Sequence, residues 1–313
     1  MRGVALITAL LVVAIASLAA TALLSSASLA IHRTAALRDS EQAWWVARGV
    51  NAWVLGILDN DRKESTYDGL DEDWARPVDY LPVDQGFVRG KVEDLQGRLN
   101  LNNLKPKNPK SLAQFRRLLK ALPDADPPPG LLDAIQDWSD ADQNPSSMNG
   151  AEDTDYLNLT PPYRAANRSF TVVSELLAVR GMTPKLFEVL RPLVAALPAD
   201  SAATATFTPI NVNTAPEAVL RALSEPIDDA KLRAFVEGRT DTPIRDDAGL
   251  EALINDGPWP QGQDVKGQLT YESQFFQIQG EVFVGSSRVA LYSLIRRAKG
   301  KTPVVVSHSA EAE

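Results

Sequence analysis

The chain is poor in the side chains that carry most protein chemistry: its 313 residues include no cysteine and two histidines, His32 and His308. Without thiols it forms no disulfide, no thiolate zinc site and no cysteine nucleophile. Two histidines at opposite ends leave almost nothing for a Ser-His-Asp triad or a zinc hydrolase. Basic residues are also few, 32 against 40 acidic ones, and the net charge of -8 opposes binding to nucleic acid. Metals with oxygen ligands remain open.

The longest feature that is present is an uncharged apolar run from Val4 to Ile31, which follows Arg2 and ends before His32 and Arg33. At 1.5 Å per helical residue, roughly 28 residues extend about 42 Å, more than the ~30 Å hydrocarbon core of a bilayer. Ala and Leu favour a helix, and the few hydroxyls can bond back to helical carbonyls. Residues 4–31 are therefore expected to be a single transmembrane helix.

Three arrangements of this run are open. A signal peptide would be cleaved after Ser28-Leu29-Ala30, but its apolar region is normally roughly 7 to 15 residues, much shorter than this run. A retained anchor is the second arrangement. Arg2-Gly3 indicates the third, seen in type IV prepilins, in which a short basic leader ends in Gly and the apolar helix is kept. Residues 1–3 are then the leader, Gly3 the cleavage site and Val4 the mature N-terminus.

An amphipathic pattern follows the run. Apolar residues recur at helical spacing as far as Leu58, so residues 32–58 are expected to continue the helix as a stem. Trp44, Trp45 and Trp53 lie about 13 or more residues past the run, or roughly 20 Å of helix, which is far for an interfacial belt. We expect them to pack against a soluble domain. Acidic and glycine residues after Leu58 should end the helix.

Alternating apolar and polar residues mark strands near both ends of the soluble part. Residues 86–94 and 98–102, separated by Gly97, predict a first β-hairpin. Residues 275–284 and 288–296 predict a second. The segments 59–104 and 271–298 would then be the two parts of one sheet module. Residues 299–313 are expected to be a disordered tail.

The interior between these hairpins is predicted to be mostly helical, with residues 105–208 as one domain and 209–270 as a second segment. Connectors are expected at residues 127–129 and 199–208. Strands at both ends with helices between indicate an α+β fold in which a large, mostly helical domain interrupts an antiparallel sheet module. The expected helices are 112–122, 130–138, 172–179, 184–197, 216–223, 229–237 and 248–254.

One acidic loop carries recognisable chemistry. Its carboxylates would repel one another unless a hard cation bound them, and oxygen ligands suit Ca²⁺ better than Zn²⁺. Asp140, Asp142 and Asn144 match the start of an EF-hand loop, but Pro145 stands where Gly is needed and Ala151 where the bidentate Glu belongs. A standard EF-hand is therefore excluded. A solvated acidic loop and a pair of glycosidase carboxylates remain alternatives.

Taken together, these features resemble the K-type minor pseudopilin of bacterial type II secretion systems. The matching motifs span almost the whole chain in the family's order, although each alone is weak. They are Arg2-Gly3-Val4-Ala5-Leu6-Ile7, Gln42-Ala43-Trp44, the run from Asp94 to Asn102, Asp137-Trp138 with Asp140 and Asp142, Gly150-Ala151-Glu152-Asp153, the run from Pro162 to Asn167, Ser174-Glu175-Leu176-Leu177 and the run from Ile210 to Ala215.

The resemblance implies a single-pass inner-membrane protein of a Gram-negative bacterium with its soluble part in the periplasm. It implies cleavage after Gly3 by prepilin peptidase, N-methylation of Val4, and a pilin-like sheet module interrupted by the helical domain. It also implies a non-enzymatic subunit at the pseudopilus tip, bound to I-type and J-type minor pseudopilins with the major pseudopilin below. There it would help to initiate assembly for the export of folded proteins from the periplasm across the outer membrane.

The resemblance further implies one or two Ca²⁺ ions in the acidic loop. Such an ion can order a long loop in a chain that has no disulfides. Asp137 sits at the end of a predicted helix, where it could instead cap the helix or form a hydrogen bond. The candidate ligands are Asp137, Asp140, Asp142, Glu152, Asp153 and Asp155.

Thr8 is the fifth residue counted from Val4, where major pilins and most pseudopilins carry Glu. A carboxylate in lipid is costly unless a neighbour's N-terminal amine neutralises it. Lacking that acid, this subunit should not need a partner stacked on its outer side, as the resemblance to a tip subunit also implies.

Two other functions are alternatives for this chain. The segment from Ile210 to Pro216 looks like the opening of a helix-hairpin-helix repeat, which suggests a membrane-anchored DNA receptor. It lacks the Gly-x-Gly hairpin that grips phosphate, and its surroundings are not basic. A periplasmic hydrolase has no pair of nucleophile and base to support it.

Overall fold

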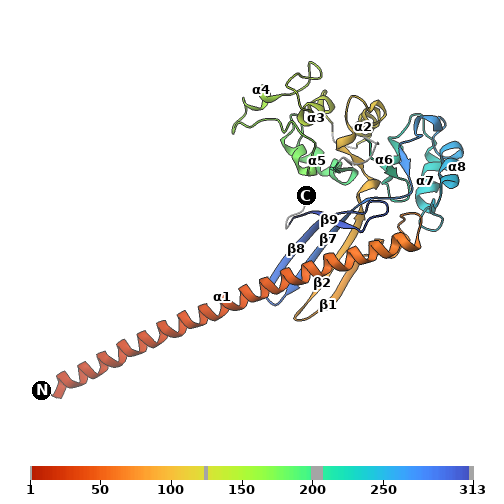
Figure 1. Cartoon of the computed structure of the whole chain (residues 1–313). Coiled ribbons are helices and arrows are strands. Elements are labelled where there is room, and N and C mark those ends of the chain that lie inside the picture. The colour runs from red at the N-terminus through yellow and green to blue at the C-terminus, as the bar shows by residue number, and fades with distance from the viewer. Residues whose placement is uncertain (1, 123–125, 199–206, 310–313) are drawn as a thin grey trace.

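The structure, a computed structural model, describes residues 2–122, 126–198 and 207–309. Its first helix, α1 (Arg2–Glu64), runs for 63 residues. No proline or other strong helix breaker interrupts it. Figure 1 shows the N-terminal half of α1 projecting alone from a head formed by a sheet and shorter helices. The predicted long apolar helix is confirmed, and it is long and apolar enough to cross a membrane.

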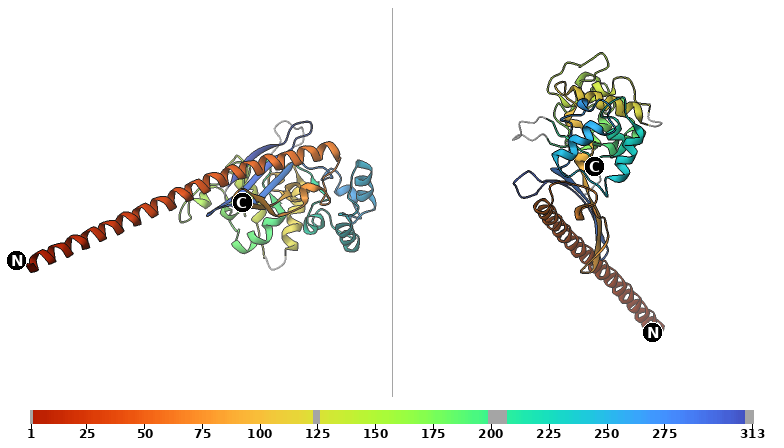
Figure 2. Two further views of the ribbon diagram at one scale, coloured as in Figure 1. Left: turned by 90° about the horizontal axis from the view of Figure 1, so that it is seen from below. Right: turned by 90° about the vertical axis from the view of Figure 1, so that its right-hand side faces the viewer.

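An antiparallel sheet of five strands, in the order β1-β2-β7-β8-β9, covers the C-terminal part of α1. Ala43, Ala47, Val54 and Leu58 of α1 are buried in one core with the inner face of the sheet. Figure 2 shows the helix running along this face. The strands are β1 (Val78–Val83), β2 (Gly86–Asp94), β7 (Phe275–Val284), β8 (Ser287–Arg296) and β9 (Val304–Ser309).

The helical part lies between β2 and β7 in the chain, which confirms the predicted α+β fold with a helical domain interrupting the sheet module. One core gathers apolar side chains of residues 99–196 together with Ala222, and another gathers those of residues 210–269. The helices are α2 (Pro109–Ala121), α3 (Leu131–Ser139), α4 (Asp153–Tyr156), α5 (Pro184–Leu190), α6 (Glu217–Arg221), α7 (Asp229–Gly238) and α8 (Asp247–Asp256). Short strand pairs join β3 (Leu99–Asn100) to β4 (Val194–Ala195) and β5 (Ile210–Asn211) to β6 (Leu269–Thr270).

Several local predictions were wrong in detail. The expected helix at 172–179 is a 3-10 helix over Val173–Ala178. The expected helix at 184–197 stops at Leu190 and is followed by a 3-10 turn that contains Pro192, whose ring and missing N–H oppose a continued α-helix. α4 was not predicted. Most of the connector expected at 199–208, residues 199–206, lies outside the described residues.

The first hairpin was assigned the wrong partner, whereas the second hairpin is confirmed as β7 and β8. β2 pairs with β1 instead of with residues 98–102. Pro82 obscures β1 in the sequence, but β1 is an edge strand, where a residue without an N–H is tolerated. Asp94 ends β2, and its side chain accepts a hydrogen bond from the backbone N–H of Gln96 in the 3-10 helix Leu95–Gly97 that follows.

The tail prediction was also wrong, because residues 304–309 form β9 and pair with β8. Three consecutive valines, Val304, Val305 and Val306, supply the β-branched side chains that favour a strand. Residues 310–313 lie outside the described residues.

The stem tryptophans are not buried in a core with the soluble domain, as they were expected to be. Trp44, Trp45 and Trp53 are 41%, 68% and 46% exposed. The small side chains of Ala43 and Ala47 face the sheet instead and let the helix approach it closely. Trp45 lies on the face of the stem opposite these alanines, and Trp53 lines a groove between the stem and the sheet.

Candidate metal centre

Three carboxylates converge in the acidic loop, which Figure 1 shows beside α3 and α4 on the side of the head away from the sheet. One oxygen each from Asp137, Asp140 and Glu152 lies within 4.8 Å of the others. Asp137 belongs to the last turns of α3, Asp140 follows that helix, and Glu152 precedes α4. Asp137 is fully buried and Glu152 is 2% exposed.

Backbone N–H groups hold Asp137 in place. Its Oδ1 accepts a 2.9 Å hydrogen bond from Ser146 N, and its Oδ2 accepts one of 2.7 Å from Ala151 N. Gly150 is required for this approach, because a Cβ there would lie 2.1 Å from Asp137 Oδ2. The loop thus closes around the carboxylate, and each of its oxygens keeps a lone pair for another ligand.

Glu152 is the least satisfied group of the three. Both of its carboxylate oxygens, and Oδ1 of Asp140, are buried without a hydrogen-bond donor. Burial and the nearby charges of Asp137 and Asp140 raise the pKa of Glu152 to about 7. Burial and the charge of Asp142 raise the pKa of Asp140. Buried carboxylate oxygens without donors are rare in folded proteins, and this all-oxygen donor set fits a hard divalent cation.

The other three predicted ligands lie elsewhere in the loop. Asp142 is exposed and accepts a hydrogen bond from Asn144 N at 2.8 Å. Asp153 accepts a 3.0 Å bond from Ala165 N. Asp155 accepts a 3.1 Å bond from Glu152 N through Oδ2. The structure therefore brings together Asp137, Asp140 and Glu152, and it engages Asp153 and Asp155 in bonds to the protein itself.

Arg180 is a site residue that the sequence analysis missed. Its guanidinium donates to Asp155 Oδ1 at 2.7 Å, to the carbonyl of Asn149 at 2.6 Å and to that of Gly150 at 2.7 Å. Arg180 lies 25 residues beyond Asp155 in the chain. No local motif links the two, so only the tertiary fold shows that they meet.

A second acidic group contains its own cation. Oxygens of Asp61, Asp68 and Glu72 lie within 4.8 Å of one another. Arg297 bonds Asp61 Oδ2 at 2.7 Å and also bonds Asp68. Burial raises the pKa of Asp68 to about 8 and, together with the charge of Glu72, that of Asp61 to about 6. Because the guanidinium of Arg297 already binds Asp61 and Asp68, this group has its own cation and is not a candidate metal site.

Buried asparagines of the sequence motifs tie distant segments together. In four of them the side-chain amide forms hydrogen bonds with both the N–H and the C=O of one distant residue, much as a strand pairs with its neighbour. Asn211 instead donates to Asp94, Ser273 and the carbonyl of Asp68. The two-point pairs are Asn100 with Leu197, Asn102 with Phe170, Asn103 with Thr208 and Asn213 with Ile244.

These contacts bear on the DNA-receptor hypothesis. Asn211 and Asn213 are 0% and 1% exposed. Their amides are bonded inside the fold, so they do not present donors to a phosphate backbone. The segment from Ile210 to Ala215 serves here to join the helical segment to the rest of the head.

The predicted processing site lies at the start of α1. Gly3 is exposed, and no heavy atom lies within 4 Å of the position that a Cβ would take. Gly3 and Val4 are helical, and Thr8 is exposed in the same helix.

Family models and relatives agree with this architecture. Models described as type II secretion system protein K match residues 97–199 and 210–268. The chain is 38% identical over 320 residues to type II secretion system protein K of Pseudomonas aeruginosa, covering 97% of this chain and 91% of the relative. It is 32% identical over 321 residues to the protein of that name in Aeromonas hydrophila, covering 97% and 95%.

A solved structure has the same fold. It is the crystal structure of the GspK-GspI-GspJ complex from the type 2 secretion system of enterotoxigenic Escherichia coli. One of its chains matches with a TM-score of 0.76 and 26% identity, covering 90% of this chain and 100% of that one. Sequence, domain models and fold thus lead to one conclusion: the chain belongs to the type II secretion system protein K family.

Proposed function

We propose that this protein is a non-enzymatic minor pseudopilin at the tip of the type II secretion pseudopilus, where it binds I-type and J-type subunits and helps to initiate assembly. The observation that carries the proposal is the similarity to a chain of a GspK-GspI-GspJ complex over 90% of this protein. The chain supplies two surfaces suited to such partners.

The first surface is the outward face of the stem, defined by Trp45, Gly49 and Gly56. Trp45 is 68% exposed, and a Cβ at either glycine would meet no heavy atom within 4 Å. Glycines in a helix interior cost about 1 kcal/mol each, but they allow another helix to approach closely. Because α1 continues towards the membrane, a helix lying along this face would come from a protein anchored in the same membrane.

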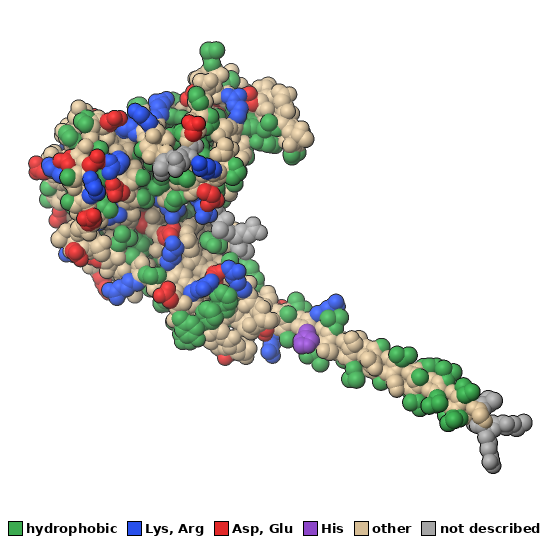
Figure 3. Space-filling model, turned by 180° about the vertical axis from the view of Figure 1, so that it is seen from behind, with side chains coloured by type: hydrophobic (Ala, Val, Ile, Leu, Met, Phe, Trp, Pro, Cys, Tyr) green, Lys and Arg blue, Asp and Glu red, His purple; other side chains and the backbone are tan. Residues whose placement is uncertain are grey.

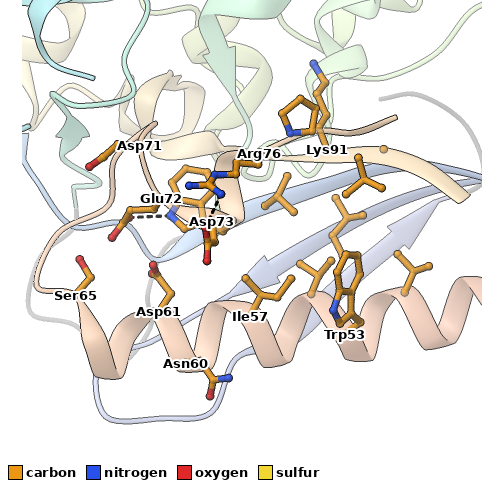
Figure 4. Close-up of a pocket in the computed structure, with 18 of the residues that line it drawn as sticks. Trp53, Ile57, Asn60, Asp61, Ser65, Asp71, Glu72, Asp73, Arg76 and Lys91 are labelled. Carbon is orange, nitrogen blue, oxygen red and sulfur yellow. Dashed lines mark hydrogen bonds and ion pairs between the residues drawn. The ribbon is translucent and has the colours of Figure 1, made fainter. Parts of the chain in front are cut away.

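A groove of about 960 Å³ lies between the stem and the sheet. Figure 4 shows Trp53 and Ile57 of α1 on one side and Arg76 and Lys91 on the other. Acidic side chains, including Asp61, gather at one end of the groove. An apolar segment with a basic end from a partner subunit fits this lining.

The second surface lies on the sheet face opposite the stem. Phe87 stacks between Tyr80 and Phe283, with centroids at 5.1 and 4.6 Å, and Arg89 lies over Phe283 at 5.3 Å. Figure 3 shows an apolar patch bordered by basic side chains at this end of the head, near the point where the helix leaves it. Exposed aromatic and arginine side chains are typical of protein interfaces.

We place α1 in the inner membrane with the head in the periplasm. Prepilin peptidase would cleave after Gly3 and Val4 would be methylated, with the major pseudopilin below the tip complex. Exposed Gly3 at the start of the apolar helix supports this maturation. Thr8, in the position where other pseudopilins carry Glu, supports a place at the tip, because it requires no subunit above it to neutralise a charge.

We also propose that the acidic loop binds Ca²⁺ through Asp137, Asp140 and Glu152. The orphaned oxygens of Glu152 support this assignment. When bound, the ion would neutralise the carboxylates and hold the loop against α3. Its role would be structural.

The function is tested by expressing the full-length chain with its I-type and J-type subunits in membranes and purifying it from detergent. We expect the three proteins to copurify in equal amounts. If the full-length chain is recovered folded and alone when both partners are present, the tip-subunit function is wrong.

A further inference from the structure

We infer that the positively charged side chain of Arg180 orders the acidic loop and takes the place of a second divalent ion. The loop therefore holds one divalent ion and not two. This inference rests on the Ca²⁺ site proposed above. It assigns Arg180 as a positioning residue for the ligands Asp137 and Glu152.

Arg180 already binds a set of oxygens of the kind that a second ion would use. Its three acceptors are a carboxylate oxygen of Asp155 and the carbonyl oxygens of Asn149 and Gly150, at 2.6–2.7 Å. Carboxylate and backbone carbonyl oxygens are the usual ligands of Ca²⁺. A guanidinium meets several such acceptors at once through its planar fork of donors.

Arg180 acts on Asp137 through a shared peptide group. The carbonyl of Gly150 accepts a bond from Arg180, and the N–H of the same peptide, which belongs to Ala151, donates to Asp137 Oδ2 at 2.7 Å. A trans peptide is planar with its C=O and N–H on opposite sides, so fixing one fixes the direction of the other. Arg180 and Asp137 therefore hold this peptide from its two sides.

Arg180 acts on Glu152 through Asp155. One oxygen of Asp155 accepts from Arg180, and the other accepts from the backbone N–H of Glu152 at 3.1 Å. This places the Glu152 backbone while leaving its side-chain oxygens without donors, within 4.8 Å of oxygens from Asp137 and Asp140.

The remaining loop carboxylates do not form a second group of three within the part of the loop that the structure describes. Asp153 is bonded to Ala165 N and paired with Arg164 at 3.4 Å, and Asp142 is exposed. A loop ordered in advance by Arg180 needs to lose less conformational freedom when the ion binds, and this strengthens binding.

The test measures Ca²⁺ binding to the detergent-solubilised full chain by equilibrium dialysis and calorimetry. We expect one ion per native chain. Arg180→Met should keep one ion but raise its Kd at least tenfold. Arg168→Met, an exposed arginine of the same domain that pairs with Glu175, is the matched control and should keep the native Kd. A purely structural Arg180 would lower the Tm equally with and without Ca²⁺ and leave the Kd unchanged.

Two ions on the native chain would overturn the inference and leave the Ca²⁺ site intact. A native Kd in folded Arg180→Met would overturn it as well. Should Arg180→Met fail to fold, Arg180→Lys decides, because it keeps the charge but loses the fork and should still weaken binding severalfold. A native chain that binds no Ca²⁺ removes the proposed site itself, and the inference with it.

Discussion

Asp94 and Asn211 lie 117 residues apart in the sequence and share a hydrogen bond of 2.9 Å in the protein interior. Asp94 ends a strand of the sheet, and Asn211 begins the second helical segment. Asp94 also accepts bonds from Gln96 N, Thr214 Oγ1 and Ser273 Oγ at 2.8, 2.6 and 2.6 Å. One buried carboxylate thus joins the two parts of the head.

Removal of the Asp94 carboxylate should destabilise the whole head. Asp94→Ala removes the acceptor of four hydrogen bonds, and we expect the free energy of unfolding to fall by about 3 kcal/mol or more. Urea unfolding followed by circular dichroism measures the loss. Asp79→Ala, at an exposed position in β1, is the control and should change stability by less than about 0.5 kcal/mol. Equal effects of the two changes would contradict this role for Asp94.

Calcium should stabilise the native chain through Glu152. At a concentration near 100 times the Kd, one bound ion adds about 2.7 kcal/mol, which corresponds to roughly 5–10 °C in Tm for a head of this size. Glu152→Gln should abolish the difference in Tm between Ca²⁺ and a chelator. Asp142→Asn changes an exposed carboxylate outside the convergent group and should keep most of that difference. A Tm that ignores Ca²⁺ in the native chain would remove the site.

Substitutions on the stem face should impair assembly without lowering the stability of the chain. In Gly49→Leu/Gly56→Leu, leucine favours the helix more than glycine does, so the Tm should stay level or rise. Its side chains fill the open space over the helix, and copurification with the I-type and J-type subunits should fall at least tenfold. Ala248→Leu, at an exposed position of α8, is the control and should assemble normally. Unimpaired assembly of the double variant would show that partners bind elsewhere.

Stability should fall with rising pH because of the cluster around Arg297. Burial raises the pKa of Asp68 to about 8 and that of Asp61 to about 6, above their usual value near 4. The folded state therefore binds these protons more tightly than the unfolded state, and its advantage is lost between about pH 4 and pH 8. Urea unfolding at pH 5 and pH 8, with a chelator present, measures the change. Asp68→Asn should flatten the dependence, and parallel slopes for the two proteins would refute the assignment.

Maturation should depend on Gly3. Gly3→Trp places a bulky side chain at the proposed cleavage site and should leave the leader attached. N-terminal sequencing and mass spectrometry of the native chain should show a methylated Val4, and the variant should begin with its leader. Correct processing of Gly3→Trp would argue against a prepilin-type leader.

The sequence was sufficient for features that depend on local pattern. The long apolar run was enough to predict α1, and the alternation in residues 275–296 was enough to predict the β7-β8 hairpin. Prediction from the sequence failed where tertiary contacts decide which segments pack or pair with each other. β2 pairs with a strand that contains Pro82, and the stem buries Ala43 and Ala47 against the sheet in place of its tryptophans. Periodicity identifies the two faces of a helix but not which of them the sheet will cover.

The candidate metal centre shows the same division. The acidic loop was evident from composition alone. The convergence of Asp137, Asp140 and Glu152 depends on how α3 and α4 close the loop, and the position of Arg180 depends on a segment more than twenty residues away. The sequence leaves open whether Asp137 caps the end of its helix or binds a metal, yet that helix is what buries Asp137 and aims it into the loop.

The length of α1 gives the molecule a mechanical property. A continuous helix of 63 residues is a rod of roughly 95 Å, and the head is packed directly on its last third. No proline interrupts the helix between its two ends. A force applied along the axis at the base of this helix is therefore transmitted to the head.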